Sequence, residues 1–476
     1  MGVYEPLPDF KTAEMPERKL GFWKMAGPGA ILVGLSIGAG EIIIWPRIAA
    51  EYGASMIWAA VAGVFIQLWI NLEIGRWTIA TGETVYTGYA RVCRCFVPIF
   101  ILLNFLAWIA PGWALGSGLA LKALVVGPQG WGSNTFWTGV TFVGVAILLF
   151  GPKVAYQSVE KTVEILVALV TVGLIVVTIR VGTTEIWGDM AKGIVNIGHI
   201  DPKMGIKPFF IALVFAGAGG TANIFYSYYL RDKHIGMGAH LPSMQNPLRG
   251  RTEKIPATGY QYEESETNEK RFRAWWDYLK KDQLLFFWGL NTITILLFIF
   301  GALAVLHPKG IVPERGTLIF DEAQILGEVW GKTGTTIFLL VGVATLFSTQ
   351  LGLVDGVART LSDLIYTNFK GAQKRDIGWW YLVIAGTWIV AGTVIIYISE
   401  NMENKISELD FLFSAAYMGG FAMAIYVPMT LYINHKFLPK SARPGAICTI
   451  MMIVASLVYV GFAGACLLGE LGIVSF

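Results

Sequence analysis

The chain is poor in charge. Of its 476 residues only 14% are Asp, Glu, Lys or Arg, whereas 55% are hydrophobic. A soluble globular protein carries about 25% charged residues, and the mean hydropathy of this chain is +0.58. This balance excludes a soluble enzyme, a disordered scaffold and a nucleic-acid-binding protein. The net charge of +3 indicates no particular partner.

Histidine and cysteine are scarce. All five histidines fall in predicted loops, which argues against a histidine metal site or proton relay inside a membrane. Cys93 and Cys95 form a Cys-x-Cys pair without a nearby histidine, a poor metal site, and we expect reduced thiols; Cys448 and Cys466 lie in the last apolar run. Neither a nucleophile–base pair nor a metal motif stands out, and the polar first 20 residues do not resemble a cleavable signal peptide. We therefore expect neither an enzyme nor a bound cofactor.

Long apolar runs recur along almost the whole chain. Each is about 20 residues long, the length that crosses a bilayer as a helix. In lipid only helices and closed barrels satisfy the backbone, and these runs are too long for barrel strands. We therefore predict an all-α polytopic membrane protein with about eleven transmembrane helices. Their expected positions are 27–52, 55–81, 96–127, 134–151, 156–181, 208–230, 283–306, 334–366, 378–399, 408–433 and 445–469.

The distribution of Lys and Arg predicts the orientation. With the N-terminus in the cytoplasm, most of the 36 basic residues fall in cytoplasmic segments, as the positive-inside rule requires. The C-terminus is then outside, and we expect an integral protein of the bacterial inner membrane. Residues 271–281, at the end of the long cytoplasmic stretch 231–281, mix basic and aromatic side chains as an interfacial helix does. The outside segment 317–330 resembles another short amphipathic helix.

Two glycine clusters interrupt apolar runs, at 36–41 in the first and 216–223 in the sixth. Glycine weakens a helix by up to about 1 kcal/mol relative to alanine, so each cluster favours a break in its helix. Breaks five helices apart are typical of transporters with inverted repeats that bind substrate at the midplane; close helix packing is the alternative. The predicted substrate-binding residues are Gly38, Ala39, Gly40, Glu41, Gly219, Gly220, Thr221, Asn223 and, in the eighth span, Gln350.

This repeat predicts the organisation of the chain. Helices 1–5 and 6–10 form the two halves, and helix 11 is an addition. The expected segments are a cytoplasmic tail 1–26, repeat 1 at 27–181, an outside loop 182–207, repeat 2 at 208–433, and helix 11 with an outside C-terminus at 434–476.

Glu41 is the strongest single candidate. A carboxylate near the middle of a membrane costs about 2.5–3.5 kcal/mol, so it marks a functional site unless it has a structural partner. It could bind a cation, a proton or a substrate amine, or it could cap the following half-helix. Asn223 occupies the matching place in the sixth run and offers an amide oxygen, either to a cation or to a neighbouring helix. With Thr221, these two residues form the predicted metal ligands.

A second group of polar residues suggests ion pairing or a gate. Asp355, Arg359 and Asp363 follow one another at four-residue spacing and so share one face of the eighth helix. Glu160, near the cytoplasmic end of the fifth helix, is a candidate for an inner-gate ion pair, although a solvated helix start explains it as well.

With these residues in view, the chain resembles a divergent member of the Nramp divalent-metal transporter family, within the superfamily that has the LeuT-like fold. Gly27-Pro28-Gly29 is similar to the segment before that family's first helix. Gln67 and Ile79-Ala80-Thr81-Gly82 resemble its conserved glutamine and the end of its second helix, and Val159-Glu160 resembles the start of its fifth. The resemblance implies a transporter with alternating access to a site between helices 1 and 6.

The chain departs from this family at the metal site. The family's Asp-Pro-Gly-Asn stands here as residues 38–41, without the Asp and with Glu41 in place of the Asn. Its Met-Pro-His corresponds to residues 220–222, so the sulfur ligand and the histidine are missing and only the following Asn223 remains. Residues 97–127 contain no Asp or Glu, whereas the family's third helix has an acidic pair for protons.

Three functions remain open. An all-oxygen ligand set suits a hard cation such as Mg²⁺ better than Mn²⁺ or Fe²⁺, which favours transport of a divalent metal. Alternatively, free amides at the glycine clusters bind an amino acid or another small organic solute, with Glu41 on its amine. The third alternative is a receptor or sensor without transport, in which residues 231–281 signal to a cytoplasmic partner. Membrane lipid is the other expected partner, and the oligomeric state is not indicated.

Overall fold

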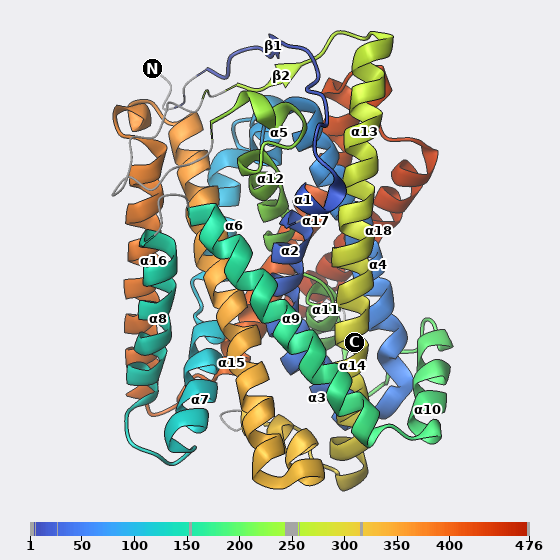
Figure 1. The fold of residues 1–476 in the computed structure, drawn as a ribbon, viewed down its shortest axis with the longest axis vertical. Coiled ribbons are helices and arrows are strands. Elements are labelled where there is room, and N and C mark those ends of the chain that lie inside the picture. Colours follow the sequence, from blue (N-terminus) through green and yellow to red (C-terminus); the bar gives the residue numbers. More distant parts are fainter. Residues whose placement is uncertain are drawn as a thin grey trace.

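The computed structural model describes residues 4, 6–25, 27–151, 155–242, 256, 258–314 and 318–473. Helices make up most of this part of the chain (Figure 1). The elements of the first half are β1 (Lys11–Thr12), α1 (Phe22–Met25), α2 (Pro28–Ser36), the π-helix η1 (Ile37–Ile44), α3 (Trp45–Tyr52), α4 (Ile57–Thr81), α5 (Val85–Val92), α6 (Phe96–Trp108), α7 (Gly112–Val126), α8 (Asn134–Phe150), α9 (Ala155–Val181), α10 (Thr184–Val195), α11 (Ile206–Val214) and α12 (Ala222–Asp232).

The second half is equally helical. Its elements are β2 (Tyr260–Gln261), α13 (Glu266–Asp282), the π-helix η4 (Gln283–Leu290), α14 (Asn291–Gly301), the π-helix η5 (Ala302–Leu306), the 3₁₀ turn η6 (His307–Lys309), α15 (Leu318–Asn368), α16 (Ile377–Glu400), α17 (Glu408–Phe437) and α18 (Ala446–Glu470).

The fold class predicted from hydropathy is confirmed. Helix occupies every one of the predicted apolar ranges, and the structure is an all-α polytopic membrane protein. Seven helical stretches of the described chain are long and apolar enough to cross a membrane. One of them, Pro28–Thr81, contains two predicted spans joined by a short turn. The count of eleven crossings therefore stays a prediction.

Local sequence explains several helix ends. The hydroxyls of Ser133, Ser265 and Ser407 accept the backbone N–H three residues later, which satisfies a free amide at the start of α8, α13 and α17. Gly82 ends α4 in the left-handed region, at a φ of 73°, where a side chain is disfavoured. Gly331, at φ 56° and ψ −138°, divides α15 into two helices. The predicted amphipathic helix is thus confirmed; we call residues 318–330 the cap helix.

The predicted interfacial helix has a different place in the structure. Residues 271–281 belong to α13, which continues through η4 into α14 along one axis instead of lying across the end of the bundle (Figure 1). Its aromatic residues hold the N-terminal segment, since Trp275 donates to the Pro16 carbonyl and Tyr278 to the Met25 carbonyl, both at 2.7 Å. Two of its aromatic side chains therefore make contacts within the protein.

The two ends of the bundle differ. At one end β1 pairs in parallel with β2, which joins the N-terminal segment to the predicted cytoplasmic stretch 231–281. At the opposite end lie α10 and the cap helix (Figure 1). Lys207, in the first turn of α11, is 2.8 Å from Glu470 at the end of α18.

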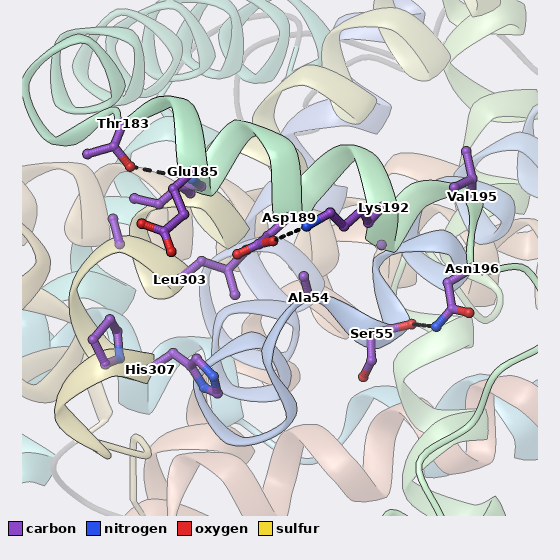
Figure 2. Close-up of a pocket in the computed structure, with 14 residues that line it drawn as sticks. Ala54, Ser55, Thr183, Glu185, Asp189, Lys192, Val195, Asn196, Leu303 and His307 are labelled. Atoms are coloured by element: carbon purple, nitrogen blue, oxygen red, sulfur yellow. Dashed lines mark hydrogen bonds and ion pairs between the residues drawn. The ribbon is translucent and has the colours of Figure 1, made fainter.

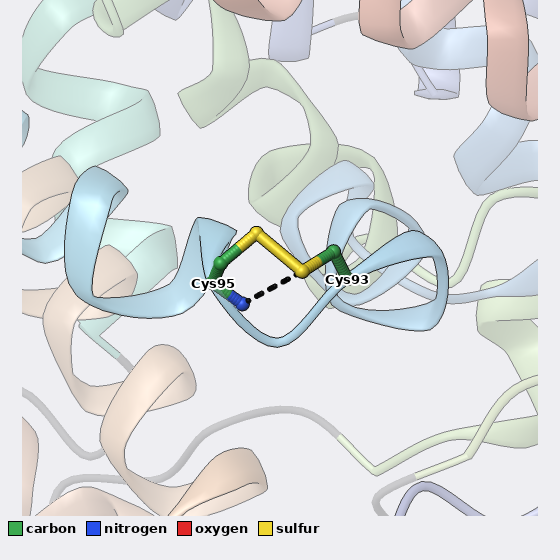
Figure 3. Close-up of a disulfide and its surroundings, with 2 residues drawn as sticks. All are labelled: Cys93 and Cys95. Atoms are coloured by element: carbon green, nitrogen blue, oxygen red, sulfur yellow. Dashed lines mark hydrogen bonds between the residues drawn. A yellow bond between two sulfur atoms is a disulfide. The ribbon is translucent and has the colours of Figure 1, made fainter.

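Cys93 and Cys95 are not two free thiols as expected. They are joined by a disulfide in the turn between α5 and α6 (Figure 3). This turn brings their Cα atoms to 5.3 Å, and the Cys95 amide donates to the Cys93 sulfur at 3.2 Å. The prediction of a reduced pair took no account of this turn. Cys448 and Cys466 are free.

Candidate functional site

The sixth predicted helix is broken where the sequence places the break. α11 ends at Val214 and α12 begins at Ala222, and the residues between them are not helical. Gly219 and Gly220 have φ values of 68° and 50°, a region that L side chains rarely adopt. A Cβ on Gly220 would also come within 2.9 Å of the Gly419 Cα in α17. Both glycines are therefore required by backbone conformation.

Gln67 of α4 satisfies the polar backbone of this break. Its amide nitrogen donates to the Val214 carbonyl at 2.9 Å, and its amide oxygen accepts from the Gly219 N–H at 3.1 Å. The hydroxyl of Tyr426, on α17, donates to the Gly220 carbonyl at 2.8 Å. Non-helical backbone at membrane depth needs partners of this kind. The break is therefore held by side chains from two other helices.

The first predicted helix is interrupted in another way. Residues 37–44 form the π-helix η1 between α2 and α3, so the α-helical ladder changes register without an unwound segment. A Cβ on Gly40 would overlap the Phe215 carbonyl oxygen at the end of α11, and a Cβ on Gly38 would overlap the Thr349 hydroxyl in α15. These two glycines thus allow close contact with the sixth and eighth helices. The side chain of Ala39 lies outside the described residues.

Glu41 is buried in this π-helix, with no exposed surface. Neither carboxylate oxygen has a hydrogen-bond partner among the described residues. The hydroxyl of Thr294 on α14 lies near the carboxylate, but it donates to the carbonyls of Leu290 and Asn291 at 3.0 and 3.1 Å. Glu41 therefore faces α14, whereas Gly40 faces the break of the sixth helix.

Asn223 and Thr221 lie beside the break, but they differ in whether their side-chain oxygen is already engaged in hydrogen bonds. The amide nitrogen of Asn223 is 3.2 Å from the Gln67 oxygen and 3.3 Å from the Tyr426 hydroxyl, and its amide oxygen has no partner in the described part of the chain. The Thr221 hydroxyl donates to Asn104 at 2.7 Å and accepts from the Trp108 indole at 2.7 Å. In this conformation Asn223 offers an oxygen and Thr221 does not.

Gln350 is the remaining predicted binding residue. It is 2% exposed, and neither its amide oxygen nor its amide nitrogen has a partner among the described residues. It lines a cavity of about 30 Å³ with Trp108 and Trp113. The Trp108 indole also donates a hydrogen bond to Thr221. This cavity therefore lies next to the break in the sixth helix.

The charged residues of the eighth helix are paired, but not only with one another. Arg359 binds Asp355 at 2.8 Å, four residues away, and also Asp232 of α12. Asp363 instead pairs with Arg231 of α12 at 3.1 Å. These five side chains are almost completely buried. The side chain of Glu160 lies outside the described residues.

A larger cavity is found away from these residues. It has a volume of about 810 Å³ and lies between α10, the 3₁₀ turn Gly53–Met56 that follows α3, and the η5–η6 segment (Figure 2). Asp189 and Lys192 form an ion pair of 3.1 Å at its edge. The His307 ring is held by its Nδ1–H, which donates to the Ala50 carbonyl at 2.8 Å. None of the substrate-binding, metal-ligand or gating residues predicted from the sequence lines this cavity.

Solved structures with a similar chain path include a transporter. A variant of the manganese transporter of Eremococcus coleocola superposes with a TM-score of 0.71 at 14% identity, covering 96% of this chain and 89% of that one. The protein MhsT in complex with L-phenylalanine superposes with a TM-score of 0.52 at 15% identity, covering 90% and 98%. The chain has the LeuT-like fold. At these identities the likeness establishes the fold alone.

Comparisons of sequence add little to this. No family model matches the chain. An uncharacterized protein of Pasteurella multocida is 27% identical over 154 residues, which is 32% of this chain and 35% of that protein. The match thus spans about a third of the relative's length, and the absence of a matching family model agrees with a divergent member of the fold.

Sequence reasoning missed most of the groups that hold the breaks together. The Ser36 hydroxyl donates to Asn291 of α14 at 2.8 Å, and Asn291 in turn reaches the Ala216 carbonyl at 3.5 Å. Gln67 was noted only for its resemblance to a family residue, and Asn104 not at all. The available signal is the same for Gln67, Asn104 and Asn291: an amide side chain inside an apolar run.

Proposed function

We propose that this protein is a secondary transporter of divalent metal cations, and that it carries a hard cation such as Mg²⁺ by alternating access. The binding region would lie where the π-helical first span meets the broken sixth helix, between two inverted repeats at 27–181 and 208–433. The observation that carries the proposal is Glu41, a fully buried carboxylate without a hydrogen-bond partner among the described residues. Such a charge is retained inside a membrane where it has a function.

The available donors favour a hard cation. Glu41 supplies carboxylate oxygens, and Asn223 and Gln350 supply amide oxygens without partners among the described residues. Oxygen ligands suit Mg²⁺ and Ca²⁺, whereas a softer metal favours nitrogen or sulfur. Thr221 would become a ligand only if it released Asn104 and Trp108. The proposed ligands are therefore Glu41, which faces α14 in this conformation, and Asn223, which lies beside the break. A single site forms from them only in a state of the cycle that brings the first span and α12 together.

The buried ion pairs suit an inner gate. They connect α12, the second half of the broken helix, to α15, and the Tyr381 hydroxyl of α16 donates to Asp355 at 2.7 Å. Thr84, in the turn before α5, donates to Asp363 at 2.9 Å. In the proposed cycle these contacts are intact while the cytoplasmic side is closed, and they separate when α12 moves.

The test is uptake of Mg²⁺, Ca²⁺ and Mn²⁺ into proteoliposomes, with wild type compared to Glu41→Gln. We expect saturable uptake that the variant loses, with Mg²⁺ or Ca²⁺ ahead of Mn²⁺. Glu51→Gln is the matched control, because Glu51 ends the same helical run, is a third exposed and pairs with Arg47 at 3.4 Å; it should keep uptake. Absence of uptake of all three metals by folded, inserted protein would refute the metal proposal.

An organic solute is the second candidate. The N-terminus of α12 follows the glycine break, and free amides at such a place bind carboxylates; MhsT, which has this fold, was solved with L-phenylalanine. The Gly219 amide, however, already donates to Gln67. Uptake of labelled amino acids, abolished by Glu41→Gln when no metal is carried, would favour this candidate. Flux of neither class would favour a receptor.

A further inference from the structure

The cap helix carries a carboxylate on its buried face. The apolar residues of this face are 0–2% exposed, and they are Leu318, Ile319, Ala323, Ile325 and Leu326. Helical spacing places Glu322 in the middle of this stripe, and its exposure is 0%. A leucine would be expected at such a position. The helix packs through Ile325 against Gly301 at the end of α14, so Glu322 is sealed between the cap helix and the bundle.

Among the described residues, the charged groups that act on Glu322 are both acidic. They are Asp321 on the same helix and Glu408, the first residue of α17, which is 1% exposed. Lys309 of η6 is 2.7 Å from Glu328 of the cap helix, and both side chains are exposed. Neither Glu322 oxygen has a hydrogen-bond partner among the described residues. The carboxylate is thus buried beside negative charge.

An ionised carboxylate in this environment would be very unfavourable. Glu408 has the helix N-terminus of α17 to stabilise its charge, whereas no described residue donates a hydrogen bond to Glu322. Burial, together with Asp321 and Glu408, raises the pKa of Glu322 well above its usual range. In the described part of the chain no third His, Cys, Asp or Glu joins the two glutamates to complete a metal site. A proton is therefore the ligand that this geometry fits.

We propose that Glu322 is a proton-binding site, and that protonation of its carboxyl from the adjoining solvent is required for the cap helix to seat on the bundle. When the proton leaves, the charged side chain can no longer remain buried beside Glu408, and the cap helix is released. The inference does not depend on which substrate the protein carries. It would give the chain a proton-linked step although its third helix has no acidic residue.

The direction of the pH dependence follows from linkage. The carboxyl binds its proton more tightly with the cap helix seated than with it released, where an ordinary pKa of about 4.3 applies. The seated state is therefore fully favoured below that pH and is lost as the pH rises toward the raised pKa. Across this window the released-to-seated ratio increases about tenfold per pH unit.

The test is labelling of a cysteine on the buried face of the cap helix. In wild type with its four cysteines replaced by serine, Ala323→Cys is reacted with a membrane-impermeant maleimide between pH 5 and 9 in proteoliposomes. Rates are divided by those of Thr333→Cys, an exposed position just beyond Gly331, which corrects for the pH dependence of thiol reactivity. We expect the corrected rate to rise at least about tenfold over this range.

Two further variants decide the outcome. Glu322→Gln keeps the shape but cannot ionise, so labelling should stay low at every pH. Glu328→Gln removes an exposed carboxylate of the same helix, and the rise should persist. A corrected wild-type rate that is flat with pH, or a rise that survives Glu322→Gln, would overturn the proposal. Because no transport is measured, a failed uptake experiment would leave this result standing.

Discussion

Two buried amides on one face of α4 allow a sharp test of how the broken helix is held. Gln67 and Asn71 are four residues apart and both are 0% exposed. Gln67 forms hydrogen bonds to the Val214 carbonyl, the Gly219 amide and the Asn223 side chain, at 2.9, 3.1 and 3.2 Å. Asn71 has no hydrogen-bond partner among the described residues. Each residue is to be replaced by leucine.

The expected magnitudes follow from these bonds. Gln67→Leu leaves up to three buried polar groups without partners, and each such group costs about 1–3 kcal/mol. Both variants gain similar burial of apolar surface, so this contribution largely cancels between them. We expect the free energy of unfolding to be lower in Gln67→Leu than in Asn71→Leu by about 2–5 kcal/mol, allowing for relaxation of the break. Asn71→Leu itself should be neutral or stabilising, because it removes a buried amide without partners.

The assay is a denaturant titration of the detergent-solubilised protein followed by tryptophan fluorescence. Gln67→Glu serves as an intermediate variant, since it keeps an acceptor for the Gly219 amide but loses the donor to the Val214 carbonyl. Equal unfolding free energies for Gln67→Leu and Asn71→Leu would refute the reasoning. They would mean that the backbone of the break finds other partners, or that it is not held by α4.

Three other substitutions are predicted, with the same assay for Arg359→Leu and Gly386→Ala and with expression of folded protein for Gly40→Ala. Arg359→Leu leaves Asp355 and Asp232 buried without their cation, so the free energy of unfolding should fall by about 3–5 kcal/mol; a fall below about 1 kcal/mol would contradict a buried network. Gly40→Ala places a methyl group on a backbone carbonyl oxygen and should prevent folding. Gly386→Ala, in the middle of α16 with nothing within 4 Å of its Cβ, should change stability by no more than about 1 kcal/mol; similar expression of both alanine variants would show that the close contact at Gly40 is absent.

Much of the fold could be predicted because its main signals are local. Membrane helices are long apolar runs, since the backbone in lipid must bond within its own segment. The break at Gly219 and Gly220 was predictable for a similar reason, because glycine tolerates the backbone conformations that end a helix. The cap helix was predicted from amphipathic spacing, and Gly331 ends it.

Other predictions depended on contacts that spacing does not contain. The glycines of the first span look like those of the sixth, yet there they allow the close contacts of a π-helix with α11 and α15. Asp363 has the spacing to pair with Arg359, but Arg231 of α12 binds it. The aromatic face of α13 resembles an interfacial anchor until the N-terminal segment is seen packed on it.

The amino-acid order alone established the class of the protein, the position of its helices, the break in the sixth and the unusual carboxylate at Glu41. These are properties of single segments, decided by the transfer of side chains and backbone into lipid. Tertiary structure decided which side-chain oxygens lack hydrogen-bond partners. The Thr221 hydroxyl bonds to Asn104 and Trp108, whereas the Glu41 carboxylate has no hydrogen-bond partner among the described residues. Whether a buried polar group is satisfied depends on the neighbours that distant helices bring to it, because a hydrogen bond reaches only about 3 Å.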